Sequence, residues 1–333
     1  LVRVCVETQL RAKLDQVMHH VAEFEEPAKN EHTPDVVIQD YADAPVLTWQ
    51  TVIGDHYFYA DGTLNIPSDR LCYDLLNTPI RVYCDRLLLP LSLLIHLELL
   101  RKRHALIHAA AVEFEGRRYL FPGLGGVGKT TLVAGIVFAG GKLYGDDLNI
   151  VNENEVLSYP QDFSVYPYHL PLLRLNERSI LRDFRRTAML NRITHVLERY
   201  DSRPAKLLRF VLNSLKVPCV HVPPRRIFGG QCFAKRGNVD EIYYVSRTAI
   251  GPKDFVIKRI ESQALARICT DILFHEWHEC LKYLYVYGVL SPFSLDKIHS
   301  DTMLVFERLF ASRPCYVLEI PVSMTNVEYQ EEL

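Results

Sequence analysis

The chain has 333 residues, of which 48% are hydrophobic and 23% charged, and its formal net charge is −2. This composition is typical of a globular protein and excludes a disordered, collagen-like or coiled-coil chain. The near-neutral charge provides no general attraction to nucleic acid or to an anionic membrane. The length fits one large domain or two modest ones.

The eight cysteines form no CxxC pair, which favours reduced thiols in a cytoplasmic protein over a disulfide framework or a zinc site. The first residues contain no long apolar stretch, so no signal peptide is expected. The most apolar run, residues 87–100, is too short to span a bilayer and contains Pro90, His96 and Glu98. It predicts a buried helix, and we expect no association with a membrane.

Residues 1–100 are predicted to form a β-rich amino-terminal lobe that ends in this linking helix. Within the lobe, β-branched and aromatic residues alternate on both sides of Asp61-Gly62, a dipeptide typical of a hairpin turn. Residues 101–333 are predicted to form the second domain, the core. No internal repeat is visible.

The core is predicted to open with a hairpin, because the apolar run 106–114 and the run 117–121 lie on either side of Glu115-Gly116. This hairpin runs directly into a glycine-rich loop, which is followed by a helix with a glycine pair at its end. The remaining pattern predicts one or two strands over 141–151, a helical insertion over 174–209, strands over 217–260 with a turn at Pro223–Arg226, helices over 262–290, and a last strand over 315–322.

The loop fits the pattern G-x-x-x-x-G-K-[ST]. Glycines let backbone N–H groups turn toward phosphate oxygens, the helix dipole points at the same phosphates, and the lysine neutralises them. The threonine hydroxyl is suited to bind Mg²⁺. A glycine-rich turn that only caps a helix is the alternative. The predicted nucleotide-binding residues are Gly123, Leu124, Gly125, Gly126, Val127, Gly128, Lys129, Thr130 and Thr131.

Asp146-Asp147 follows the next predicted strand. Two adjacent carboxylates at a strand end can hold Mg²⁺ and accept a proton from an attacking hydroxyl, whereas Gly-Asp-Asp is also good turn chemistry. We expect Thr130 and Asp146 to be the metal ligands. His108 lies in the first hairpin strand, where a lone histidine is more often a buried core residue than a catalyst.

The stretch IHAAAVEFEGRRYLFPGLGGVGKTTLVAGIVFAGGKLYGDDLNIV resembles the catalytic domain of bacterial HPr kinase/phosphorylase and its HPr-kinase-related relatives. His108 lies 21 residues before Lys129, and Asp147 lies 17 residues after Thr130. The resemblance implies an α/β fold with a mixed sheet, akin to that of phosphoenolpyruvate carboxykinase. It also implies ATP or GTP with Mg²⁺ as cofactors, and homo-oligomers are frequent in that family.

By the same resemblance, the catalytic residues are Asp147 as general base, Lys129 as phosphate ligand, and His108 beside the γ-phosphate. The glycine-rich acidic signature and the amino-terminal domain of the HPr enzymes are not recognisable here. The phosphocarrier protein is therefore not the expected acceptor. A small molecule, a peptide or protein serine and an RNA hydroxyl all stay open.

Residues 174–209 contain ten basic and four acidic residues, a local excess of six positive charges. A solvated helix face would explain this excess, and so would a docking surface for an anionic acceptor. Arg225 and Arg226 are a weaker candidate for contact with the γ-phosphate. The basic residues are Arg174, Arg178, Arg182, Arg185, Arg186, Arg192, Arg199, Arg203, Lys206 and Arg209.

Two clusters are assigned no chemistry. His275, His278 and Cys280 lack the spacing of a zinc site, so a helix surface is expected there. The three tyrosines over 283–287 are expected to pack rather than to stack on bases, and no nucleic-acid-binding signature accompanies them.

The leading hypothesis is an Mg²⁺-dependent kinase that transfers the γ-phosphoryl group of ATP to an acceptor hydroxyl. The alternative is a nucleotide-gated binding or regulatory module without phosphoryl transfer. A carboxykinase comes last, since the chain is short for one and no lysine-plus-histidine Mn²⁺ site is evident.

Overall fold

The computed structural model describes residues 2–10, 33–159, 161–173, 175, 178–197, 219–230, 232–249 and 254–324, together with the single residues 206, 208 and 212. Part of the predicted basic segment lies outside these residues, namely Arg174, Arg199, Arg203 and Arg209.

The amino-terminal lobe is built on a mixed sheet whose described strands follow the order β1-β2-β7-β6-β5-β4-β3. β1, β2 and β7 pair in parallel, and the other pairs are antiparallel. The predicted turn at Asp61 and Gly62 joins β4 to β5, with φ of 48° and 85°, which confirms this hairpin. The strands are β1 (Val4–Glu7), β2 (Val36–Gln39), β3 (Thr51–Ile53), β4 (Tyr57–Ala60), β5 (Thr63–Ile66), β6 (Leu71–Asp74) and β7 (Ile80–Cys84).

The second sheet is also mixed, and its described strands follow the order β15-β12-β11-β8-β9-β16-β18-β17, with β10 paired to β8. β8 and β9 form the predicted antiparallel hairpin, whereas β9, β16 and β18 run in parallel. A small pair, β13 with β14, lies apart. The strands are β8 (Ala105–Phe114), β9 (Arg117–Pro122), β10 (Lys142–Gly145), β11 (Leu148–Val151), β12 (Glu155–Leu157), β13 (Phe163–Val165), β14 (Val220–Val222), β15 (Arg236–Asn238), β16 (Glu241–Thr248), β17 (Val256–Arg259) and β18 (Cys315–Pro321).

The helices follow the predicted ranges with two corrections. Helix α9 lies beyond the predicted stretch 262–290 and was missed, although its buried residues Ile298, Thr302, Phe306 and Leu309 recur at helical spacing. The segment expected to turn at Pro223–Arg226 instead forms the short helix α6, because a proline suits the first turn of a helix, where its missing N–H is not needed. The α-helices are α2 (Leu91–Arg101), α3 (Lys129–Phe138), α4 (Arg178–Leu197), α6 (Pro224–Phe228), α7 (Ser262–Glu276), α8 (Leu281–Leu290) and α9 (Leu295–Phe310). The 3-10 helices are η2 (Tyr41–Asp43), η3 (Pro67–Asp69), η4 (Pro167–His169) and η5 (His278–Cys280).

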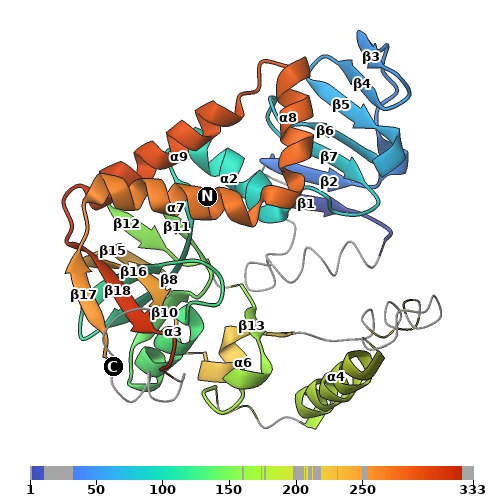
Figure 1. Ribbon diagram of the computed structural model, residues 1–333. Coiled ribbons are helices and arrows are strands. Elements are labelled where there is room, and N and C mark those ends of the chain that lie inside the picture. The colour runs from blue at the N-terminus through green and yellow to red at the C-terminus, as the bar shows by residue number, and fades with distance from the viewer. Residues whose placement is uncertain are drawn as a thin grey trace.

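Helices α2, α7, α8 and α9 lie between the two sheets, and α8 lies beside the amino-terminal sheet (Figure 1). The hydroxyl of Tyr73 in β6 donates to the carbonyl of Tyr283 in α8 over 2.9 Å, and the amide of Leu75 donates to the hydroxyl of Tyr287 over 3.0 Å. One apolar cluster includes residues of the first sheet, these helices and β8. The carboxy-terminal helices therefore join the two parts of the chain, and a domain boundary at residue 100 stays a prediction.

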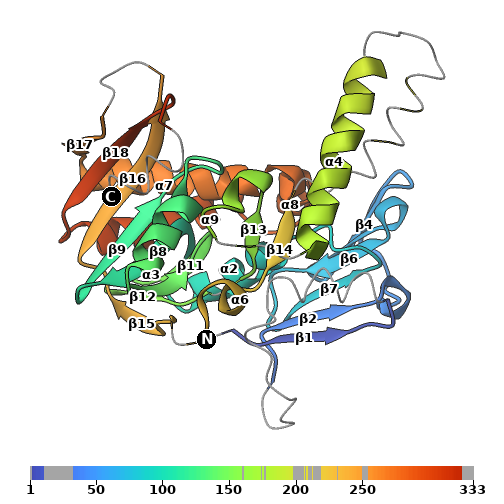
Figure 2. The ribbon, with the colours of Figure 1, turned by 90° about the horizontal axis from the view of Figure 1, so that it is seen from below.

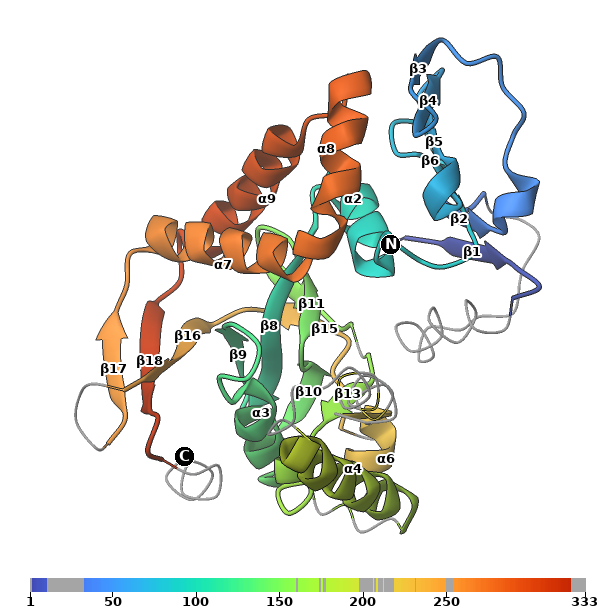
Figure 3. The ribbon, with the colours of Figure 1, turned by 45° about the vertical axis from the view of Figure 1, so that its right-hand side comes forward.

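Around the loop, α3 lies against the second sheet, and α4 extends away from it (Figures 2 and 3). Ile180 and Phe184 of α4 belong to a second apolar cluster, which also contains Leu132 of α3 and Phe121 of β9. α4 is therefore anchored to the side of the core that carries the glycine-rich loop, by its amino-terminal half.

Helix α2 matches the prediction of a buried helix, with every residue from Leu91 to Leu99 buried. No helix among the described residues is both long and apolar enough to cross a membrane. All eight cysteines are free thiols.

His96 of α2 links this helix to the core sheet and to α9. It is fully buried, its Nδ1 accepts the amide of Leu106 over 3.0 Å, and its Nε2 lies 2.9 Å from the hydroxyl of Thr302. Burial lowers the pKa of His96 to about 3. The unfolded chain therefore takes up a proton below pH ~6.5 that the folded chain does not.

We expect this difference to destabilise the fold as the pH falls from about 6.5 toward 3. Between pH 7.5 and pH 5, His96 should remove about 2 kcal/mol from the free energy of unfolding, and the His96→Gln variant should lack this contribution. Urea denaturation at both pH values measures it. The exposed His275, replaced by Gln, is the control and should retain the wild-type pH dependence. If the free energy of unfolding depended on pH equally in the wild type and both variants, His96 would not be the source of the effect.

Candidate active site

The glycine-rich loop lies between β9 and α3, as its motif requires. β9 ends at Pro122 and α3 begins at Lys129, so the loop enters directly from the hairpin strand and leaves into a helix. Gly128 is the amino-terminal cap of α3 with φ of 107°, a conformation that side-chain-bearing residues rarely adopt. The strand–loop–helix context predicted from the sequence is therefore confirmed.

Gly123 is needed for a reason that the motif alone does not reveal. A Cβ at this position would lie 2.7 Å from the carbonyl oxygen of Val245 in β16 and 3.0 Å from Cγ2 of Val127. Nearby, Nε of Arg247 donates to the carbonyl of Val127 over 3.2 Å, and its Nη1 donates to the carbonyls of Pro321 and Met324. The loop is thus held against β16 by close backbone packing and by one arginine.

We expect Gly123→Ala to lower the free energy of unfolding by about 1–3 kcal/mol, because the contacted backbone must shift to admit the methyl group. Gly125 is the matched control, since a Cβ there meets nothing within 4 Å. Gly125→Ala should change the free energy of unfolding by less than about 1 kcal/mol. Chemical denaturation of both variants measures the two free energies of unfolding. Equal values would show that the backbone of β16 can shift to admit the methyl group at no cost.

Asp146 and Asp147 occupy an irregularity in a bent strand. β10 pairs with the end of β8 and β11 with its beginning, and the chain bends at the two aspartates between them. The shift in register lies just before this bend, between Leu143 and Gly145. The amide of Ala109 donates to the carbonyl of Asp147 over 3.0 Å, and Nδ2 of Asn149 donates to the carbonyl of Ala109 over 2.7 Å. From this bend Asp146 reaches Thr130 of the glycine-rich loop and Asp147 reaches His108 of β8.

His108 and Asp147 lie in contact. Leu148 is the register partner of His108, so the preceding aspartate stands beside the imidazole, and Nε2 of His108 lies 2.6 Å from Oδ1 of Asp147 in a hydrogen bond. The histidine is buried, whereas the Asp147 side chain is 55% exposed. Asp147 can therefore meet a molecule arriving from solvent while a buried ring orients it.

Lys129 connects this pair to the loop. Its ammonium donates to the carbonyls of Gly123 and Leu124 over 2.8 and 3.0 Å. It also lies 3.3 Å from Nε2 of His108 and 4.0 Å from Oδ1 of Asp147. Burial lowers the pKa of Lys129, and the nearby carboxylates oppose this shift. A buried cation at the mouth of a glycine loop is suited to bind phosphate oxygens.

Thr130 and Asp146, the two predicted metal ligands, also contact one another. The hydroxyl of Thr130 donates to Oδ2 of Asp146 over 2.7 Å, and the second oxygen, Oδ1, is buried without a hydrogen-bond partner among the described residues. Burial raises the pKa of Asp146 to about 7, and the neighbouring charge of Asp147 adds to this effect.

These two residues fit an Mg²⁺ site of the nucleotide-bound type. No group of three or more His, Cys, Asp or Glu side chains suited to a metal occurs in the described part of the chain. Mg²⁺ commonly takes only one or two protein ligands and completes its shell with water and substrate phosphates. An unpaired buried carboxylate oxygen beside a threonine hydroxyl suits that arrangement.

Glu276, a residue that the sequence analysis missed, reaches the same cluster from the end of α7. Its Oε1 lies 3.3 Å from Nδ1 of His108, on the side of the ring away from Asp147. Its charge also acts on the pKa of Lys129. Glu276 lies inside HEWHEC, a segment that the sequence suggests only as an incomplete metal motif. No sequence pattern around Glu276 indicates that it contacts β8.

The other candidates lie elsewhere. His275 and His278 are exposed and stack on one another, whereas Cys280 is buried, in agreement with the expected helix surface. Tyr283 and Tyr287 are buried, as expected for packing residues, whereas Tyr285 is 60% exposed, so the packing prediction was wrong for Tyr285. The guanidinium of Arg225 lies over the ring of Phe233, at 5.8 Å from its centroid. The basic residues of α4 with described side chains are exposed, namely Arg178, Arg182, Arg185, Arg186 and Arg192.

A scan against protein-family models gave no match for this chain, and a search of curated proteins gave none either. Functional arguments therefore rest on the geometry of the site and on its sequence motifs.

Proposed function

We propose that this chain is an Mg²⁺-dependent kinase of the HPr-kinase-like type, which transfers the γ-phosphoryl group of ATP to an acceptor hydroxyl. One observation carries the proposal: at the bend formed by Asp146-Asp147, one carboxylate contacts the loop threonine and the other lies beside His108 and the loop lysine. Phosphoryl transfer requires mainly positioning and charge neutralisation, and this cluster offers both.

Each residue has a place in this scheme. The loop amides and Lys129 bind the phosphates, and Mg²⁺ held by Thr130 and Asp146 would neutralise charge on them. Asp147 accepts the proton of the acceptor hydroxyl while the oxygen of that hydroxyl attacks the γ-phosphorus. The bond from that phosphorus to the bridging oxygen breaks, and ADP leaves. His108 orients the carboxylate of Asp147.

The exposed arginines of α4 favour an anionic acceptor, because the helix is anchored on the loop side of the core. The free thiols at all eight cysteines suit a reducing compartment such as the cytoplasm.

Incubation with γ-labelled ATP and fractionated cell extract tests the proposal. We expect the label to appear in an acceptor as an acid-stable phosphate ester, the product of transfer to an alcohol. Label found only in free phosphate would indicate hydrolysis. Tight ATP binding without a labelled product from any fraction would favour a nucleotide-gated binding module instead. In such a module, Arg247 could transmit a movement of the loop to the end of β18, because it donates to the carbonyls of both Val127 and Pro321.

A further inference from the structure

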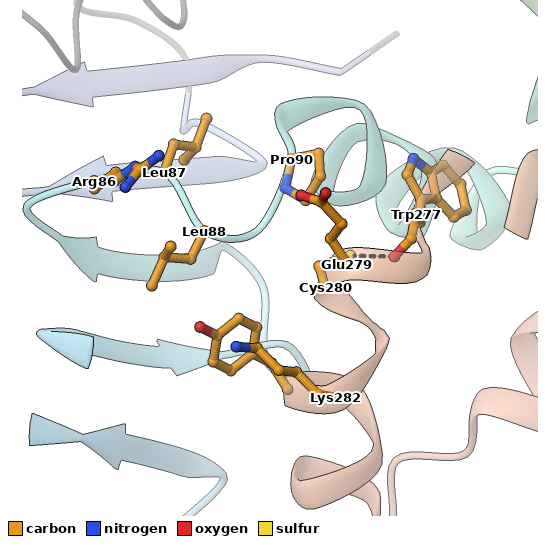
Figure 4. Close-up of a pocket in the computed structure, with 9 residues that line it drawn as sticks. Arg86, Leu87, Leu88, Pro90, Trp277, Glu279, Cys280 and Lys282 are labelled. Atoms are coloured by element: carbon orange, nitrogen blue, oxygen red, sulfur yellow. Dashed lines mark hydrogen bonds between the residues drawn. The ribbon is translucent and has the colours of Figure 1, made fainter. Parts of the chain in front are cut away.

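A cavity lies in the crease where the amino-terminal sheet meets α8, and no residue of the glycine loop lines it. Its volume is about 500 Å³, within the range of about 300–1,000 Å³ that small-molecule sites occupy. Leu87, Leu88 and Tyr283 contribute apolar walls, and Trp277 lies at one end of it (Figure 4). Because both parts of the chain line it, an occupant would contact both.

The charges of the lining are unevenly distributed. Arg86 lies at the end opposite Glu279, and Lys282 stands between them over the ring of Tyr283, at 4.6 Å from its centroid (Figure 4). Arg86 is exposed and has no hydrogen-bond or ion-pair partner among the described residues. Arg86, just after β7, and Lys282, in α8, thus place two cations next to apolar walls, which suits an anion attached to a flat apolar body.

The cavity is linked to the candidate active site through Trp277. Its backbone directly follows Glu276, the carboxylate that faces His108. Its ring lies 5.0 Å from that of His96, whose Nδ1 accepts the amide of Leu106 in β8. His108 follows two residues later on the same strand. The first connection is one peptide bond and the 3.3 Å approach of Glu276 to His108, and the second is a ring contact followed by a hydrogen bond, so a shift of Trp277 reaches His108 by short paths.

We infer that this crease is a regulatory site for a small organic anion with a flat apolar body, and that its occupant changes nucleotide affinity through Trp277. The inference extends beyond the proposed phosphoryl transfer, because it concerns binding at two sites and holds whether or not the nucleotide is turned over.

The binding step can be tested with anilinonaphthalene sulfonate, an aromatic anion, and with its uncharged analogue N-phenylnaphthylamine. The full chain carrying Trp49→Phe retains Trp277 as its one tryptophan. We expect saturable energy transfer from Trp277 to the anionic probe, with affinity about tenfold higher than for the neutral one, since charge-assisted contacts contribute about that much.

Arg86→Gln should remove this preference, whereas Arg81→Gln, an exposed arginine on the preceding strand, should retain it. Lys129→Met should also retain it, because the probe would not occupy the glycine loop. Three results would each contradict an anion site in this cavity. They are equal affinity for the two probes, an unchanged preference for the anionic probe in Arg86→Gln, and loss of that preference in Lys129→Met.

The regulatory step is tested by calorimetric titration with a non-hydrolysable ATP analogue. Saturating anilinonaphthalene sulfonate should change the dissociation constant of the analogue by about fivefold or more, and saturating analogue should change the affinity for the probe by the same factor. Arg86→Gln should abolish the coupling. Unchanged nucleotide affinity, or full competition between the two ligands, would overturn the regulatory role, and neither result depends on finding a phosphate acceptor.

Discussion

Phosphoryl transfer by the Asp147→Asn variant is expected to fall about 10²–10⁴-fold, the usual contribution of general acid–base catalysis. The amide keeps the size of the carboxylate and can still meet Nε2 of His108, which lies 2.6 Å from Oδ1 in the native chain. It cannot, however, accept the acceptor proton at neutral pH. ATP binding should be retained, because the phosphates contact the loop and Lys129 rather than this side chain.

The measurement is single-turnover transfer from γ-labelled ATP, together with the ATP dissociation constant of the same protein. Asp55→Asn, at an exposed turn of the amino-terminal lobe, is the control and should behave as the wild type. Transfer at a near-normal rate in Asp147→Asn would remove the base role from this residue, even if the protein proves to be a kinase.

The Lys129→Met variant is expected to lose both affinity and rate. A charged hydrogen bond to phosphate contributes about 1.5–3 kcal/mol, so the ATP dissociation constant should rise about tenfold or more. Loss of a preorganised positive group at the transferring phosphate should lower the rate by about a further 10²–10³-fold. The ammonium also holds the carbonyls of Gly123 and Leu124, so the loop itself should become less ordered.

Lys142→Met, at the start of β10, is the matched control, because its exposed ammonium lies near Glu113 rather than the loop. Equilibrium binding of labelled ATP and transfer at saturating ATP separate the two effects. An ATP affinity equal to that of the wild type would mean that the glycine loop does not bind phosphate in the expected way.

Much of the site was predictable because its parts are local in sequence. The glycines, Lys129 and Thr130 belong to one continuous loop, and the hairpin before it follows from two apolar runs on either side of Glu115-Gly116. The helix over residues 87–100 was equally clear, since an apolar run of that length suits a buried helix. The prediction failed at the helix α6, where the Pro-Pro pair was assigned to a turn although proline also favours the first helical turn. It also missed the helix α9, whose buried residues recur at helical spacing.

The sequence by itself determined the loop, the entry hairpin and the presence of two adjacent carboxylates, because each depends on the chemistry of neighbouring residues. Only the tertiary structure decided what these groups face. The bend between β10 and β11 and their pairing with β8 bring Asp146 to Thr130 and Asp147 to His108, and the end of α7 brings Glu276 to the far side of the same ring. Such contacts depend on strand register and on the packing of distant helices, which no local pattern encodes.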